Sequence, residues 1–293
     1  MTAISASRKP RQNQAWHLRR RAAVILIHGV LGALSLLWVI PFYWLVITSL
    51  KPLEQVFSVP LTWFPDPVQW INYIQAFTHP GFPFLRLLAN SMIYAVPSTV
   101  GAALSCSIVA YAFARMEFWG RDVLFSITLA SMMLPGVVQL VPTYLLFHRL
   151  GLIGSFAALI VPSYFGSAFY IFMLRQFFLT LPWELTDAAH VDGANDWRIF
   201  WQIMLPLIKP AVLAVVVFNF VGCWNDFMGP LLYLQDSTKY PLSIGLYAFQ
   251  TQHETQWHLM MAATLTVTVP LITIFFLAQR QFIEGITLTG IKV

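Results

Sequence analysis

Residues 22–50 read AAVILIHGVLGALSLLWVIPFYWLVITSL, and these 29 residues include no Asp, Glu, Lys or Arg. The hydrocarbon core of a bilayer is about 30 Å thick, which about 20 apolar residues in a helix can cross. The run is also longer than the apolar core of a cleavable signal peptide, which has about 7–15 residues. We therefore expect it to stay in the chain as a membrane-spanning helix.

The rest of the chain has the same character. Of its 293 residues, 58% are hydrophobic and only 10% are charged, whereas a soluble domain carries about 25% charged residues. So few charges do not cover a water-soluble surface, and we expect most of this surface to face lipid. The net charge of +5 does not indicate nucleic-acid binding, because the basic residues flank the apolar runs.

Six apolar stretches are long enough to cross a bilayer: 22–50, 87–114, 123–147, 151–174, 210–235 and 258–279. Backbone groups in lipid must be hydrogen-bonded within their own segment, so these stretches are predicted to be helices. The only charged residue in them is Asp226. The sequence therefore predicts an all-α, polytopic membrane protein with six transmembrane helices.

The basic residues predict the orientation, because cytoplasmic loops are enriched in Lys and Arg. With the N-terminus inside, 13 Lys and Arg residues lie on the inner side and 4 on the outer side. Both termini are thus expected in the cytoplasm. The chain divides into a basic N-terminal tail at 1–21, a six-helix domain at 22–280 with an inner loop at 180–206, and a C-terminal tail at 281–293.

Two helical stripes give more detail. In the outer segment, Trp70, Tyr73, Ile74 and Phe77 follow the spacing of one helical face and predict a short helix on the membrane surface, as an anchor or a docking element. Within the second apolar stretch, small residues recur every fourth position, a pattern that lets helices approach closely. They are Ser98, Ala102, Cys106, Ala110 and Ala114.

The inner loop carries the signals of a short helix. Pro182 suits the first turn of a helix. The acidic residues Glu184 and Asp187 favour its positive start, and Gly193 can end it and turn the chain. We expect a small-sided, acidic helix that lies below the membrane.

The same loop resembles the signature loop of ABC importer permeases. Asp187-Ala188-Ala189 is followed after three residues by Gly193, and after nine more by Ile203-Met204-Leu205-Pro206. In that family the loop forms a coupling helix that sits in a cleft of the ATPase subunit. The family usually has Glu where this chain has Asp187. Aspartate keeps the negative charge, but its side chain is one methylene shorter. The resemblance implies an ATPase-docking loop that includes Glu184, Asp187, Ala188, Ala189, Asp192, Gly193 and Pro206.

Other stretches are similar to the maltose-type carbohydrate uptake branch of the family. They are SLKP at 49–52, Asn90-Ser91, AYAFAR at 110–115, WNDF at 224–227 and the segment 279–292. The resemblance implies the shorter of two permease subunits, in the bacterial plasma (inner) membrane. It also implies a second, different permease, two ATP-binding subunits, an external solute-binding protein and a sugar substrate, with no nucleic acid among the partners.

Asp226 is a candidate functional residue, because a charge inside a membrane is energetically costly and is seldom present without a role. With Trp224 and Asn225 it is a candidate for the substrate pathway. Alternatively, Asp226 lies near the outer interface and pairs with Asn225 or with a partner subunit.

No pattern in the sequence indicates an enzyme. It has no phosphate-binding Gly-x-x-x-x-Gly-Lys-Ser/Thr loop, no nucleophile with a base, and no metal-ligand spacing among its seven His and two Cys. We predict no catalytic residue, metal or cofactor.

The mostly uncharged spans fit a neutral, hydroxyl-rich solute such as a sugar or sugar derivative. Glycerol phosphate or another polar solute is an alternative. A secondary transporter would need inverted repeats and ion-binding groups, and a membrane-embedded enzyme would need paired catalytic side chains.

Overall fold

The computed structural model describes the backbone of residues 11–250 and 255–289, and the side chains of 21–250 and 255–279. Its first and last helices extend into the predicted tails, of which 1–10 and 290–293 lie outside the described residues. The helices are α1 (Arg11–Ser49), α2 (Leu53–Val56), α3 (Ile71–Thr78), α4 (Phe84–Arg115), α5 (Arg121–Ser131), α6 (Gly136–Arg149), α7 (Ala157–Ile160), η1 (Val161–Phe165), α8 (Ala168–Thr180), α9 (Glu184–Val191), α10 (Asp196–Ile199), η2 (Phe200–Met204), α11 (Leu205–Leu207), α12 (Lys209–Asn225), α13 (Met228–Tyr233), η3 (Ser237–Lys239), α14 (Leu242–Gly245), η4 (Leu246–Phe249) and α15 (Trp257–Thr289).

The all-α prediction is confirmed, since the only β pairing among the described residues is an isolated bridge between Gln250 and Thr255. Four stretches are long and apolar enough to cross a membrane: Arg21–Ser49, Phe84–Arg115, Ala157–Thr180 and Trp257–Gln279. The number rises to six if the bent pairs α5–α6 and α10–α12 each form one span. Six crossings stay a prediction.

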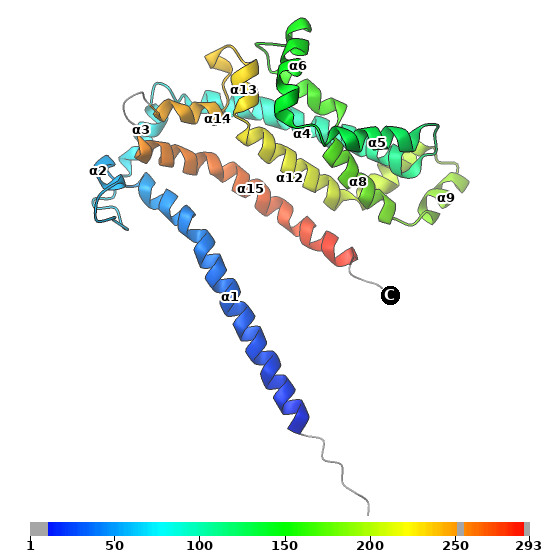
Figure 1. Ribbon diagram of the computed structural model, residues 1–293, viewed down its shortest axis with the longest axis horizontal. Helices are drawn as coiled ribbons and strands as arrows, with labels where there is room; N and C mark the ends of the chain where they lie inside the picture. The colour runs from blue at the N-terminus through cyan, green and yellow to red at the C-terminus, as the bar shows by residue number, and fades with distance from the viewer. Residues whose placement is uncertain (1–10, 251–254, 290–293) are drawn as a thin grey trace, which may run out of the picture.

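Three of the expected helices are interrupted. The stretch 123–147 bends by 103° between α5 and α6, where Pro135 lacks an N–H and disfavours a helical conformation of the residue before it. In the stretch 151–174, Gly166 has a φ of 86° and separates η1 from α8. In the stretch 210–235, α12 ends at Asn225 because the backbone of Asp226 is extended, and the separate helix α13 follows. Figure 1 shows α6 turned away from the long helices.

The helix α4 lies at the centre of the fold and packs against α8, η1 and α12. All five residues of its small-residue stripe are at most 2% exposed, so the packing prediction is confirmed. Small side chains let neighbouring backbones approach closely, and close contact replaces the hydrophobic effect as the attraction between helices in lipid. By contrast, the membrane-length part of α1 has none of its most apolar window buried, and α1 diverges from the other helices (Figure 1).

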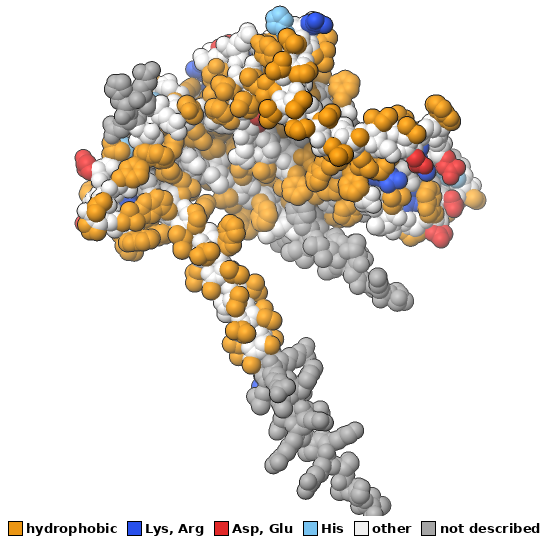
Figure 2. Space-filling model, viewed as in Figure 1, with side chains coloured by type: hydrophobic (Ala, Val, Ile, Leu, Met, Phe, Trp, Pro, Cys, Tyr) orange, Lys and Arg blue, Asp and Glu red, His pale blue; other side chains and the backbone are white. Residues whose placement is uncertain are grey.

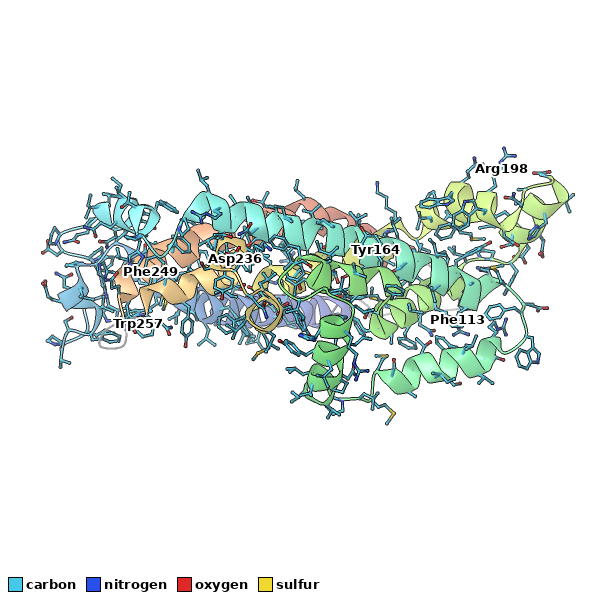
Figure 3. All side chains as sticks on the ribbon, turned by 90° about the horizontal axis from the view of Figure 1, so that it is seen from above. Phe113, Tyr164, Arg198, Asp236, Phe249 and Trp257 are labelled. Atoms are coloured by element: carbon cyan, nitrogen blue, oxygen red, sulfur yellow. The ribbon has the colours of Figure 1, made fainter. Side chains whose placement is uncertain are left out.

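The molecule has two distinct ends along its long axis. The α3 end holds α2, α3 and α14, and the α9 end holds α9 and the start of α5 (Figure 1). Phe249 and Trp257 lie toward the α3 end and Arg198 at the α9 end (Figure 3). One apolar cluster fills each end, with Phe82, Phe249 and Ala262 in the first and Phe178, Phe200 and Met204 in the second.

Polar contacts fasten the α3 end. The buried Asn72 amide donates to the carbonyls of Ser49 and Lys51 at 3.0 and 2.9 Å, which satisfies one group at the end of α1 and one just past it. The Lys51 ammonium donates to the carbonyl of Thr62 at 2.6 Å and lies over the ring of Trp44. Burial lowers the pKa of Lys51. The expected short helix is present as α3, which buries Asn72 and leaves Ile74 59% exposed. Its place on the membrane surface stays a prediction.

Packing along α4 gives a testable prediction. Ala110→Leu adds three carbon atoms where the side chain is 0% exposed, and overpacking of this kind costs about 1–3 kcal/mol. We expect the apparent melting temperature of the detergent-solubilised chain to fall by roughly 3–8 °C. Ala89→Leu is the matched control, because Ala89 is exposed on the same helix. An equal fall in both variants would contradict this account of α4.

Candidate functional site

The 180–206 loop folds into a chain of short helices at the α9 end, between α8 and α12 (Figure 1). The carbonyl of Trp183 accepts the first hydrogen bonds of α9, from the backbone N–H groups of Thr186 and Asp187 at 2.8 and 3.1 Å. Glu184 and Asp187 lie in its first turn, where negative charge is stabilised by the helix dipole. The predicted helix is therefore present, with its acids at the expected end.

Gly193 ends α9 as the sequence predicted. Its φ is 80°, which an L side chain rarely adopts. The N–H of Gly193 donates to the carbonyl of His190 at 3.0 Å, and the N–H of Ala194 donates to that of Ala189 at 2.9 Å. These two bonds satisfy carbonyls in the last turn of α9 and send the chain back toward α10.

The two alanines of the loop motif differ in exposure. Ala189 is 7% exposed and packs into the cluster that includes Phe178 and Ile199. Ala188 is exposed, as are Leu185 at 38% and Val191 at 87%. The resemblance placed both alanines in the docking loop, and the structure leaves Ala188 on the surface while Ala189 has an internal packing role.

The far side of the loop begins with a capped helix and then changes helix type. The side chain of Asn195 accepts the N–H of Arg198 at 2.9 Å and starts α10. The π-helical η2 follows, and the exposed Pro206 lies directly beyond it in α11. Proline offers no N–H for a regular helix, and the chain turns by 79° between this segment and α12.

The exposed surface of the loop is acidic. Glu184, Asp187, Asp192 and Asp196 are all exposed, and Figure 2 shows acidic side chains gathered at this end of the molecule. Only Asp196 among these four has an ion-pair contact in the described residues, with the His190 ring at 3.5 Å. The loop thus presents carboxylates to its surroundings on a small, firmly based helix.

The second candidate group, Trp224, Asn225 and Asp226, lies at the junction of α12 and α13. The Asp226 carboxylate accepts the Tyr94 hydroxyl at 2.8 Å and the N–H of Gly229 at 3.0 Å. Its backbone carbonyl accepts the Ser243 hydroxyl at 2.6 Å. Asp226 therefore ties α4, α13 and α14 together. Sequence reasoning missed Tyr94, because no local pattern links it to a residue 132 positions away.

Trp224 and Asn225 differ in exposure. Trp224 is 2% exposed, and its ring N–H donates to the carbonyl of Val267 at 3.2 Å, so it packs in the core instead of lining an open path. Asn225 is exposed and donates to the carbonyl of Val221 in its own helix at 2.9 Å. The junction and the 180–206 loop are separate sites. Among the described residues, no group of three or more His, Cys, Asp or Glu could hold a metal ion.

Comparison with solved structures supports the fold. A bacterial ABC transporter involved in the import of the acidic polysaccharide alginate superposes with a TM-score of 0.77 over 94% of this chain and 100% of that chain, at 20% identity. At that identity the likeness concerns the fold alone.

Comparison with sequences identifies the family. Residues 103–287 match the family described as binding-protein-dependent transport system inner membrane component. The diacetylchitobiose uptake system permease of Streptomyces coelicolor is 30% identical, covering 98% of each chain. The arabinooligosaccharides permease of Bacillus subtilis is 33% identical, covering 88% of this chain and 92% of that one. The sn-glycerol-3-phosphate permease of Yersinia enterocolitica is 34% identical, covering 91% and 97%. The chain belongs to this family of inner membrane components, the permease subunits of ABC importers.

Proposed function

We propose that this chain forms half of the membrane pathway of an importer for a sugar or sugar derivative, and that α9 is the coupling helix that docks into a separate ATPase subunit. The observation that carries the proposal is α9 itself, a short acidic helix with Ala188 outward and Ala189 fixed in the core. The other proposed docking residues are Glu184, Asp187, Asp192, Gly193 and Pro206.

The proposed complex contains a second, different permease, two ATP-binding subunits and an external solute-binding protein. The exposed apolar part of α1 supports the second permease, because α1 packs against α15 at one end only and its most apolar stretch diverges from the other helices with no residue buried. A helix of that kind is covered by lipid or by other spanning helices. We propose six crossings of the bacterial inner membrane with both termini in the cytoplasm, a cytoplasmic tail at 1–21 and another at 281–293.

The orientation can be tested by thiol labelling. With Cys106 and Cys223 replaced by alanine, we expect a cysteine at the 97% exposed Val59, or at the exposed Ser237, to react with an impermeant reagent outside intact cells. A cysteine at the exposed Asn195 should react only after the cells are opened, because the basic residues place the 180–206 loop inside. Labelling of position 195 from outside would contradict the topology.

The coupling role is tested by Ala188→Trp and Gly193→Val. The indole of Ala188→Trp projects from an exposed position, so the permease itself should fold while a fitted ATPase cleft is blocked. No atom lies within 4 Å of a side chain at Gly193, so Gly193→Val strains only the backbone, by about 1–3 kcal/mol. We expect both variants to lose ATPase during co-purification, or to hydrolyse ATP without solute uptake.

Gly151→Val is the matched control for Gly193→Val. Gly151 also has a positive φ, 68°, and open space around it, but it lies in the turn after α6. We expect it to show comparable strain with the ATPase retained and hydrolysis still coupled. Normal uptake and normal ATPase retention in both Ala188→Trp and Gly193→Val would show that α9 is not the coupling helix.

The substrate class is proposed from the chemistry of the spans and from the relatives. The predicted spans contain no Lys or Arg that could pair with an anionic solute, and their only charged residue, Asp226, accepts hydrogen bonds from Tyr94 and Gly229. We expect the reconstituted complex with its binding protein to take up a neutral oligosaccharide. Uptake of radiolabelled glycerol phosphate in preference to oligosaccharides would contradict this assignment.

A further inference from the structure

A buried cation stands at the point where α4 meets the 180–206 loop. Arg115 is the last residue of α4, and its side chain is 6% exposed. Burying a guanidinium is costly unless its donors are used, and replacing such a group by an apolar side chain is often tolerated. Its place in the fold therefore calls for an explanation other than stability.

The contacts of Arg115 lie at the end of α8 and in the linker that leads to α9, while its buried Nε and Nη1 atoms have no hydrogen-bond partner among the described residues. Its Nη2 atom donates to the carbonyls of Phe178 at 2.6 Å and Leu181 at 2.5 Å. These carbonyls belong to the end of α8 and to the linker, where helix carbonyls lack partners and the dipole favours positive charge. The guanidinium also lies over the ring of Trp183 at 4.5 Å, an attractive cation–π arrangement.

Trp183 connects this cation to α9, because its carbonyl accepts the first two hydrogen bonds of that helix. One side chain from α4 thus holds the end of α8, the linker and the start of α9. A lysine at this position carries the charge but lacks the planar guanidinium group that lies over the ring of Trp183.

We propose that Arg115 is a positioning residue that fixes α9 to the end of α4, so that a displacement of α9 moves α4. The functional consequence rests on the proposed coupling role of α9. In this arrangement a displacement of α9 is passed along α4 to Tyr94. The hydroxyl of Tyr94 is hydrogen-bonded to Asp226 at the junction of α12 and α13. Arg115 links the docking helix to the wall of the pathway without touching either the ATPase or the solute.

The test uses the complete reconstituted complex, with a spin label on Val191→Cys in a background of Cys106→Ala and Cys223→Ala. Val191 is 87% exposed on α9. We expect Arg115→Met and Arg115→Lys to raise the detached, mobile population of the label roughly 10-fold, as loss of hydrogen bonds to a charged group would. ATP hydrolysed per solute transported should rise in parallel.

Arg175→Met is the matched control. Arg175 also donates to a backbone carbonyl, that of Phe113 at 3.3 Å, and stacks on Phe125, but it does not contact the start of α9. In the Arg175→Met variant the spin label at position 191 should stay immobile, and the ATP hydrolysed per solute transported should not change. Trp183→Leu removes a ring that is 48% exposed, so it keeps the test valid if Arg115→Met fails to fold, and it should also mobilise the label.

The outcomes separate this proposal from the coupling role. An immobile label in Arg115→Lys and Trp183→Leu would overturn the positioning role of Arg115, as would equal mobility in Arg175→Met. A mobile label with an unchanged coupling ratio would support the positioning role and contradict the assignment of α9 as the coupling helix.

Discussion

Close packing of helix backbones along α4 is the constraint on which the other features depend. In lipid, apolar side chains gain little by leaving their surroundings, so helices associate through close contact and hydrogen bonds. The small residues of α4 meet that requirement against α8 and α12. Because α4 is fixed in this way, polar groups along it can hold other elements at set positions. Asn90 holds the backbone of Thr238 and Tyr240 at the α3 end, Tyr94 holds Asp226, and Arg115 holds the approach to α9.

The interruptions of the helices fall where side chains compensate for lost backbone bonds. At Asp226 the chain leaves α12, and the same carboxylate accepts the N–H that α13 leaves free at its start. Gly229 lies so close that a side chain on it would clash with that carboxylate. The carboxylate thus stabilises the break between α12 and α13. Its hydrogen bonds from Tyr94 and Gly229 explain how Asp226 is tolerated without a cationic partner in the described part of the chain.

Much of this arrangement was predictable from local sequence patterns. Apolar length predicted the helices, and the four-residue spacing predicted the buried face of α4. Glu184 and Gly193 predicted the bounds of α9, whereas Pro182, expected in its first turn, lies just before the helix. What the sequence could not show were the pairings between distant residues, such as Tyr94 with Asp226, because nothing local encodes a contact across 132 positions. The bend of 103° after α5 was missed for another reason. Proline is common within membrane helices, so Pro135 alone does not separate a kink from a break.

The two alanines of the loop show that a single motif can combine two physical requirements. Ala189 packs among Phe178, Ile199 and their neighbours on the inner side of α9, where a larger side chain would have to displace them. Ala188 has no such limit within its own chain, since it is exposed. Its small size is therefore not explained by the fold of the permease, but it is explained if another surface closes over it. The acidic residues of α9 can likewise be divided into those that the fold explains and those that it does not. The dipole of α9 accounts for Glu184 and Asp187 at its start, whereas Asp192 lies at the opposite end, where the dipole disfavours a carboxylate. The residues that the fold does not require, Ala188 and Asp192, are thus the ones that argue most strongly for an external partner.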